Sequence, residues 1–95
     1  MNPDTAIGQH ASPLNELVRR IRSRPDFITF LHAFLSEFRQ NPEQWENRDL
    51  SSFLNAMSAW VVDMDGYYQN QGECVPDQPS WKTVGEMLLA AAVYE

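Results

Sequence analysis

The stretch LSSFLNAMSAWVVDMDGYY, residues 50–68, is the part of the chain that decides the fold. Its apolar side chains recur every three or four positions, which is the spacing of one face of an α-helix. This stripe consists of Leu50, Phe53, Leu54, Met57, Trp60, Val61, Met64 and Tyr68. Asn47 or Asp49 can cap the start of the helix, and Gly66 marks either its end or its last turn. We therefore predict a helix over residues 48–67, with Trp60 in the core.

Two helices are predicted before this stretch. Ser12-Pro13 is a typical helix start, and a short apolar stripe after it predicts a helix over residues 13–22. Ser23 and Asp26 can cap the next helix, and Asn41-Pro42 ends it, so a helix is predicted over residues 24–40. Its face is the clearest amphipathic pattern in the chain and comprises Phe27, Phe30, Leu31, Phe34, Leu35 and Phe38.

A last helix is predicted over residues 81–94, after a loop at residues 69–79 that contains one glycine and two prolines. Ser80 caps this helix, and its alanines and Gly85 are small enough to let a neighbouring helix approach closely. That neighbour is either an internal helix or a second subunit. No stretch alternates with the period of a strand. The sequence predicts an all-α, compact bundle of about four helices, with residues 1–11 as a flexible N-terminal segment and residues 12–95 as a single helical domain.

Composition restricts the function. The net charge of the 95 residues is −6, which argues against a nucleic-acid partner because phosphate binding needs a basic surface. The basic stretch Arg19–Arg24 is the exception, and its role stays open between an anionic partner and pairing within the chain. The start of the sequence lacks a signal peptide, and its longest apolar run is too short to span a membrane. We expect a cytoplasmic protein with no membrane contact.

The chain lacks the usual motifs of catalysis and cofactor binding. Asp63-Met64-Asp65-Gly66 resembles part of a calcium loop, but the first and twelfth positions of that loop would be Val61 and Gly72, which cannot ligate through their side chains. His10, His32 and Cys74 are not spaced as a metal site or a nucleophilic dyad. We predict no catalytic residue, no metal and no cofactor, and we regard the protein as more typical of a binding module than of an enzyme.

One segment combines carboxylates with aromatic rings, and it is the candidate binding surface. Tyr67 and Tyr68 project about 100° apart on a helix, so we expect at least one ring to be exposed. Exposed tyrosine and tryptophan beside a loop are typical of interaction surfaces, although rings that simply cover the core would give the same pattern. The candidate residues are Asp63, Asp65, Tyr67, Tyr68, Glu73 and Trp81.

The order of these motifs resembles a family of small bacterial proteins known only as a domain of unknown function. The resemblance covers about Phe27 to Glu95 and includes Trp45-Glu46-Asn47, Leu50, Phe53-Leu54, Ala59-Trp60, Asp63 to Tyr68, Asn70 to Glu73, Pro76, Gln78-Pro79, Trp81 and Tyr94-Glu95. It implies a helical, free-standing bacterial domain and implies no activity. It also implies that the segment from Asp63 to Glu73 is a feature of the family.

Three functional hypotheses follow. The first is a protein- or peptide-binding module, immunity-like in one version, whose acids select a basic partner and whose aromatic rings supply the buried contact. The second is an enzyme that holds a divalent ion between Asp63, Asp65 and Glu73, which requires these carboxylates to converge. The third is a structural homodimer built on the alanine-rich last helix. The sequence does not decide between a monomer and a homodimer.

Overall fold

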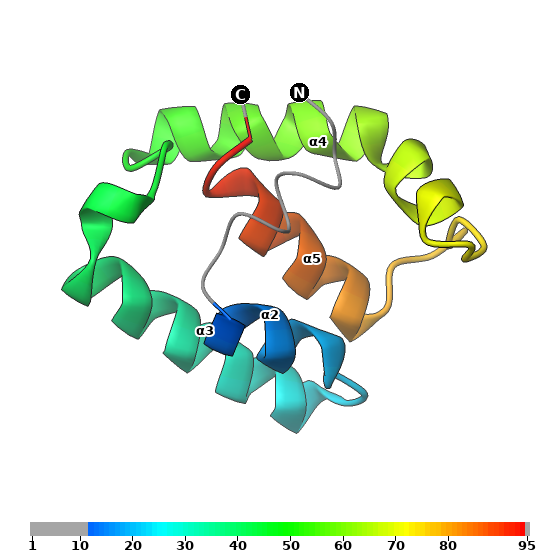
Figure 1. Ribbon diagram of the computed structural model, residues 1–95, viewed down its shortest axis with the longest axis horizontal. Coiled ribbons are helices and arrows are strands. Elements are labelled where there is room, and N and C mark those ends of the chain that lie inside the picture. Colours follow the sequence, from blue (N-terminus) through cyan, green and yellow to red (C-terminus); the bar gives the residue numbers. More distant parts are fainter. Residues whose placement is uncertain (1–11, 95) are drawn as a thin grey trace.

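The computed structural model describes residues 12–94, which form four α-helices and one short 3-10 helix (Figure 1). α2 spans Ser12–Arg19, α3 spans Arg24–Gln40, the 3-10 helix η1 spans Pro42–Gln44, α4 spans Leu50–Asn70, and α5 spans Trp81–Ala91. The predicted all-α bundle is confirmed, and no strand occurs within these residues. The predicted flexible segment 1–11 lies outside the described residues.

The helix α5 is the centre of the arrangement. It packs against α2, α3 and α4, and its packing with α4 is the most extensive in the described part of the chain. Figure 1 shows α4 on one side of α5 and α3 on the other, with α2 lying across α3 and α5. α3 and α4 therefore each pack against α5 more than they pack against each other.

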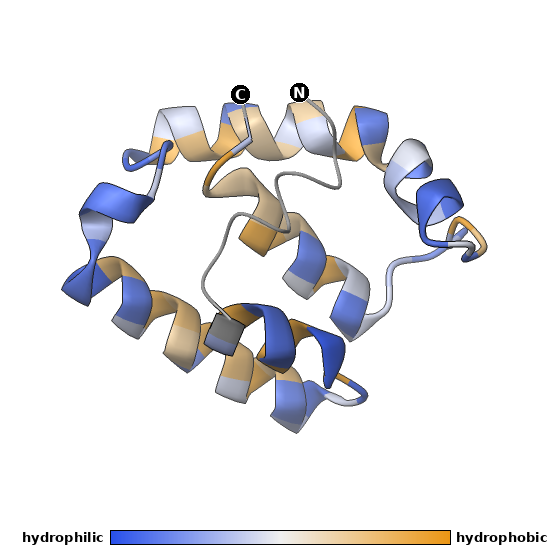
Figure 2. Ribbon diagram, in the orientation of Figure 1, coloured by the Kyte–Doolittle hydropathy of each residue, from blue (hydrophilic) through white to orange (hydrophobic). Residues whose placement is uncertain are grey.

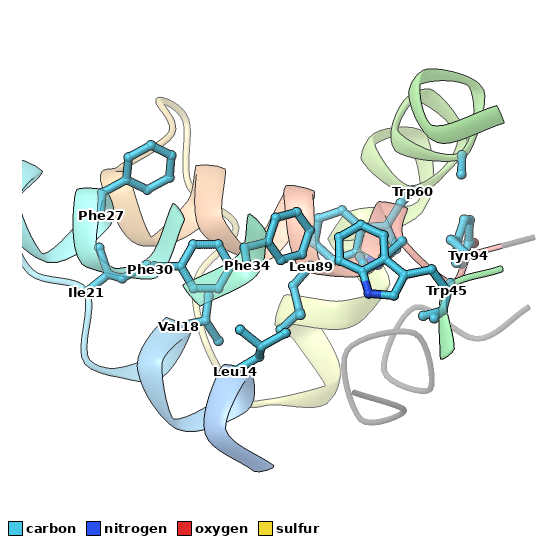
Figure 3. Close-up of a cluster of buried hydrophobic side chains, with 14 residues drawn as sticks. Leu14, Val18, Ile21, Phe27, Phe30, Phe34, Trp45, Trp60, Leu89 and Tyr94 are labelled. Atoms are coloured by element: carbon cyan, nitrogen blue, oxygen red, sulfur yellow. The ribbon is translucent and has the colours of Figure 1, made fainter. Parts of the chain in front are cut away.

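Aromatic rings run through the core from one end to the other. Figure 2 shows the apolar faces of the helices turned towards α5, and Figure 3 shows Phe27, Phe30, Phe34 and Trp45 in a row beside Leu89. The ring centroids of Phe30 and Phe34 are 5.4 Å apart, and those of Phe34 and Trp45 are 4.6 Å apart. Trp60 is fully buried, as predicted. Rings at these distances pack in offset and tilted contacts that stabilise the core.

The predicted caps form at three helix starts. The Ser23 hydroxyl accepts a hydrogen bond from the Asp26 N–H of α3, and the Asp26 carboxylate accepts one from the Arg22 N–H. Asp49, rather than Asn47, caps α4 by accepting from the Ser52 N–H at 2.9 Å. Ser80 caps α5 by accepting from the Thr83 N–H at 3.1 Å. These bonds satisfy N–H groups that have no partner within their own helix.

Three predicted helix ends were wrong by several residues. α2 stops at Arg19 instead of residue 22, and α5 stops at Ala91 instead of residue 94. α4 continues past Gly66 to Asn70, where Gly72 adopts a φ of 72°. The Gly72 N–H donates to the Gln69 carbonyl and the Glu73 N–H donates to the Tyr68 carbonyl. This pattern ends a helix with a left-handed glycine, so Gly72 ends α4 and Gly66 is tolerated inside it.

Asn47 holds the carboxyl end of α5. Its side-chain amide donates to the carbonyl oxygens of Ala91 at 2.9 Å and Tyr94 at 2.8 Å, and its backbone N–H donates to that of Ala92 at 2.9 Å. The last carbonyls of a helix have no partner within it, and the end of α5 is buried away from water. Asn47 thus donates hydrogen bonds to the carbonyl oxygens at the buried end of α5, although it lies more than 40 positions earlier in the sequence.

The small residues of α5 face the interior of this chain. Ala90, Ala91 and Ala92 are completely buried. A Cβ atom at Gly85 would lie 2.7 Å from Cδ1 of Ile21 and 3.2 Å from Cγ2 of Val18, so the glycine lets α2 and α5 approach closely. The predicted close neighbour of the last helix is therefore internal. The homodimer hypothesis was wrong to place a subunit interface on these alanines, because no partner can reach them.

None of the described helices combines the length and the apolar character that a membrane crossing requires.

We predict that Asn47→Ala lowers the free energy of unfolding by about 1–3 kcal/mol, because two buried carbonyl oxygens lose their donor. Asn55→Ala is the matched control, since Asn55 is exposed on α4 and alanine favours a helix. Urea denaturation followed by circular dichroism measures both variants. Equal stability of the two variants would contradict the assigned role of the Asn47 amide.

Candidate functional site

The two tyrosines of the predicted binding surface point into the molecule and meet a residue that sequence reasoning missed. The Tyr68 hydroxyl donates to Oε1 of Glu86 at 2.7 Å, and the Tyr67 hydroxyl donates to Oε2 at 3.0 Å. Tyr68 is buried and Tyr67 is half-buried. The expectation that the two rings are not both buried agrees with the partial exposure of Tyr67, but both hydroxyls are directed at α5 and not at solvent.

Glu86 is a buried carboxylate on the central helix, with only 4% of its surface exposed. Burial raises the pKa of Glu86, and the hydrogen bonds from Tyr68 and Tyr67 act in the opposite direction. The pKa of Tyr68 is raised by its own burial and by the neighbouring carboxylate. The three side chains form a polar cluster that joins the end of α4 to α5 inside the protein.

Asp63 takes part in a second link between α4 and the end of the described chain. Its carboxylate accepts a hydrogen bond from the Tyr94 hydroxyl. Burial and the Asp63 carboxylate raise the pKa of Tyr94 to about 12. The Tyr94 side chain is almost completely buried, so this bond fixes the turn that follows α5 against α4. Asp63 has a structural partner in the protein, in addition to any role at the surface.

The remaining predicted residues do not gather around one point. Asp65 and Glu73 are exposed. Trp81 is partly exposed, and the centroid of its ring lies 5.3 Å from that of the Phe27 ring. Among the histidine, cysteine, aspartate and glutamate side chains that the structure describes, no group of three or more could hold a metal ion. The convergence of Asp63, Asp65 and Glu73 required by the enzyme hypothesis is therefore absent, and that expectation was wrong.

A large opening lies at the other end of α4, where sequence reasoning did not place a site. It is a groove of about 560 Å³ between the second half of α3, the segment after η1 and the start of α4. Phe34, Trp45 and Phe53 form its aromatic floor, and Leu35 and Leu50 stand at its sides. The other lining residues are Leu31, His32, Phe38, Asn47, Arg48 and Asp49. The elements that line it meet at the end of the molecule where η1 connects α3 to α4 (Figure 1).

The polar residues at the groove are mostly held by the fold. The Asn47 amide bonds to the end of α5, and the Arg48 guanidinium donates to the carbonyl oxygens of Trp45 and Glu43. The Asp49 carboxylate caps α4, and its hydrogen bonds from Ser52 lower its pKa. These groups are occupied within the chain, so the groove offers mainly an apolar surface to whatever enters it.

The apolar surface continues from the groove onto the exposed side of α4. Leu50 is 72% exposed, Leu54 is 51% exposed and Val61 is 39% exposed. The sequence assigned all three to the buried face of this helix, and that assignment was wrong. Ala56, Trp60 and Tyr68 are the buried residues of α4, and Phe53 and Met64 are partly buried against the core, where α5 is the main helix that packs on α4. Leu50, Leu54 and Val61 of the apolar stripe face solvent.

Comparison with known proteins places this chain in a family. Residues 23–95 match the family described as "Family of unknown function (DUF7660)". The chain belongs to this family. The match confirms the resemblance to a family of unknown function that the sequence indicated from about Phe27 onwards. No curated protein and no solved structure matches the chain. The DUF7660 match covers α3, η1, α4 and α5, and so includes every residue that lines the groove.

We predict that Glu86→Gln gains stability relative to the wild type as the pH rises. The folded state holds the Glu86 proton more tightly than the unfolded state, so the contribution of Glu86 to the free energy of unfolding falls as pH rises above its ordinary pKa of 4.5. The glutamine variant lacks this titration.

Urea denaturation of both proteins at several pH values from 4.5 to 8 measures the difference. Glu73→Gln is the control, because Glu73 is exposed on the loop after α4. A difference between Glu86→Gln and wild type that stays constant across this range would contradict the raised pKa.

Proposed function

We propose that this protein is a protein-binding module that receives an apolar helical segment of a partner in the groove between α3 and the start of α4. The observation that carries the proposal is the groove itself, an opening of about 560 Å³ with an aromatic floor and exposed leucines at its sides. Exposed apolar surface that is contiguous, rather than scattered, is typical of an interaction site.

The floor of the groove supplies the type of contact on which protein–protein affinity depends. Trp45 contacts both Phe34 and Phe53, and the centroid of its ring lies 4.6 Å and 6.2 Å from theirs. A partner side chain inserted above these rings would be surrounded by apolar atoms and removed from water. Burial of apolar surface contributes about 25 cal/mol per Å², and a few centrally buried anchors usually dominate the binding energy.

The shape of the groove favours a helix as the entering element. Its walls are themselves helices, α3 and α4, and its sides present leucines at helical spacing. An amphipathic helix that lies in such a groove contacts it with residues at positions i, i+3 or i+4, and i+7. A flat polar surface would bind by a different mode. The groove therefore supports helix recognition by apolar contact.

The predicted acidic surface gives less support to a binding role. Asp65 and Glu73 are exposed, but Tyr67 and Tyr68 direct their hydroxyls at Glu86 and do not form an exposed aromatic contact with these acids. Asp49 is the only acid among the residues that line the groove, and it caps α4. Apolar contact, rather than attraction to a basic partner, is the basis of the proposal.

A photo-crosslinking amino acid at position 35 tests this proposal. Leu35 stands at the side of the groove, so we expect a crosslink in living cells to one specific polypeptide, which mass spectrometry then identifies. The same crosslinker at position 69 is the control, because Gln69 is exposed near the far end of α4. Identical adducts at both positions, or none at position 35, would contradict a binding role for the groove.

Purified components complete the test. We expect Leu50→Glu to reduce affinity for the identified polypeptide at least tenfold, which corresponds to about 1.4 kcal/mol. Because Leu50 is 72% exposed, the variant should fold normally. Gln69→Glu carries the same added charge outside the groove and should bind as the wild type does. Unchanged affinity of the Leu50→Glu variant would show that the crosslink reported proximity alone.

A further inference from the structure

The exposed side of α4 carries a regular apolar seam. Leu50, Leu54, Met57 and Val61 follow one another at spacings of four, three and four residues. This is the spacing at which two helices pack side chains of one into gaps of the other. Met57 is half-buried and the other three are exposed, so the seam lies beside the groove and faces solvent. A helix with such a seam fits a second helix.

The surface around the seam is uncharged. All thirteen residues from Leu50 to Val62 lack a charged side chain, and the exposed ones beside the seam are serines, an asparagine and Val62. Charged residues are depleted at the centres of protein interfaces. Charges beside a helical seam are also the usual means of selecting a different partner. This seam has none, so nothing on it excludes a copy of itself.

Net charge restricts where two copies of this chain can meet. Each copy carries a formal charge of −6, so two copies repel each other overall. The helix face from Leu50 to Val62 is a surface on which two copies can touch without placing like charges in contact. Two identical seams are also complementary by construction in a twofold dimer.

We propose that the helical segment bound at this face is the α4 helix of a second copy, in a twofold dimer with the two α4 helices antiparallel. This inference rests on the proposed function and names the partner. The centre of the seam lies between Leu54 and Met57, so Leu50 of each copy contacts the partner's Val61. Leu54 of each copy contacts the partner's Met57. The helix of the partner also covers the mouth of the groove beside Leu50.

Charge at the ends of the seam determines the antiparallel direction. Asp63 and Asp65 follow Val61, and Glu73 and Asp77 lie in the loop beyond α4, with no lysine or arginine between residues 49 and 81. A parallel pair would bring these acidic ends together. An antiparallel pair separates them by the length of the seam and places each beside Arg48 and Asp49 of the other copy, and it also aligns the two helix dipoles favourably.

The dimer interface reaches the area that a stable dimer requires only if α3 also contributes to it. A stable interface covers about 800 Å² on each partner, which is about a seventh of the 5717 Å² surface of this chain. One short seam is a small part of that area. Ile28 and Leu35 on α3 are each 45% exposed, and Leu35 stands at the groove opposite Leu50. Leu35 extends the apolar surface beyond α4, so the dimer contact includes both walls of the groove.

Two neighbouring valines give a matched test of this interface. Val61 lies on the seam, whereas Val62 is 79% exposed and projects about 100° away from it. Val61→Glu and Val62→Glu therefore add the same charge to the same helix at adjacent positions. Sedimentation equilibrium of the full chain at several concentrations measures the mass, and circular dichroism checks that each variant is folded.

We expect the wild type and Val62→Glu to be dimers and Val61→Glu to be a monomer. A wild type that stays monomeric at about 100 μM would overturn the inference. Its free energy of association would then be weaker than about 5 kcal/mol. A dimer that survives Val61→Glu would also overturn it, because the contact would then lie elsewhere. Neither result affects the groove as a binding site for a different polypeptide, which the crosslinker at position 35 tests separately.

A mixing experiment tests the antiparallel direction. Leu50→Lys alone and Val61→Glu alone should each be monomeric, because each puts charge into the apolar contact. In a mixture, the lysine of one variant meets the glutamate of the other at one end of the seam, while wild-type Leu50 and Val61 meet at the other end. We expect the mixture to form a heterodimer. A mixture that stays monomeric would overturn the antiparallel arrangement.

Discussion

The burial of α5 between three other helices is the constraint on which the rest of the structure depends. Its inner face carries Leu89 and the alanines 90–92, which are fully buried, and Gly85 allows α2 to approach closely. Such a helix is stable only if its buried carbonyl end finds donors, and Asn47 provides them. Asn47 lies two residues before Asp49, the cap of α4, so the contact that completes α5 also holds the segment where α4 begins.

This central position of α5 explains both the polar cluster and the groove. At one end of α4, Tyr67 and Tyr68 reach across to Glu86, and the cluster closes the gap between α4 and α5 with hydrogen bonds. At the other end, α3 and α4 both pack on α5 and stand apart from each other, which leaves the groove open above Trp45. The polar cluster stabilises the fold, and the groove leaves apolar side chains exposed.

The sequence predicted the features of the fold that depend on neighbouring residues. Ser23, Asp49 and Ser80 cap helices because each bonds to an N–H three positions later, and such contacts are visible in sequence. The predicted end of α4 was wrong because a glycine can either lie within a helix or end it. Gly72, with its left-handed φ, was the true signal, but the turn around it also depends on Tyr68 and Glu73.

The candidate site was harder to predict, because it depends on which side of each helix meets α5. Periodicity defined a wide apolar stripe on α4, but it could not show that Trp60 would be buried while Leu54 would be exposed. The partner of the two tyrosines, Glu86, lies 18 and 19 positions away, and no local pattern connects them. A carboxylate in the middle of a mostly apolar helix was the one available sign of a buried polar contact.

The place of α5 in the chain order has a consequence for how the protein is made. During synthesis, α2, α3 and α4 emerge from the ribosome before α5, at about 5–20 residues per second. Until α5 follows, α3 and α4 lack the surface on which both pack, and Asn47 has no helix end to hold. The core therefore forms only after α5 has emerged, and until then the aromatic residues of α3 and α4 are uncovered. Such a chain is most exposed to chaperones and proteases in the interval before its central helix appears.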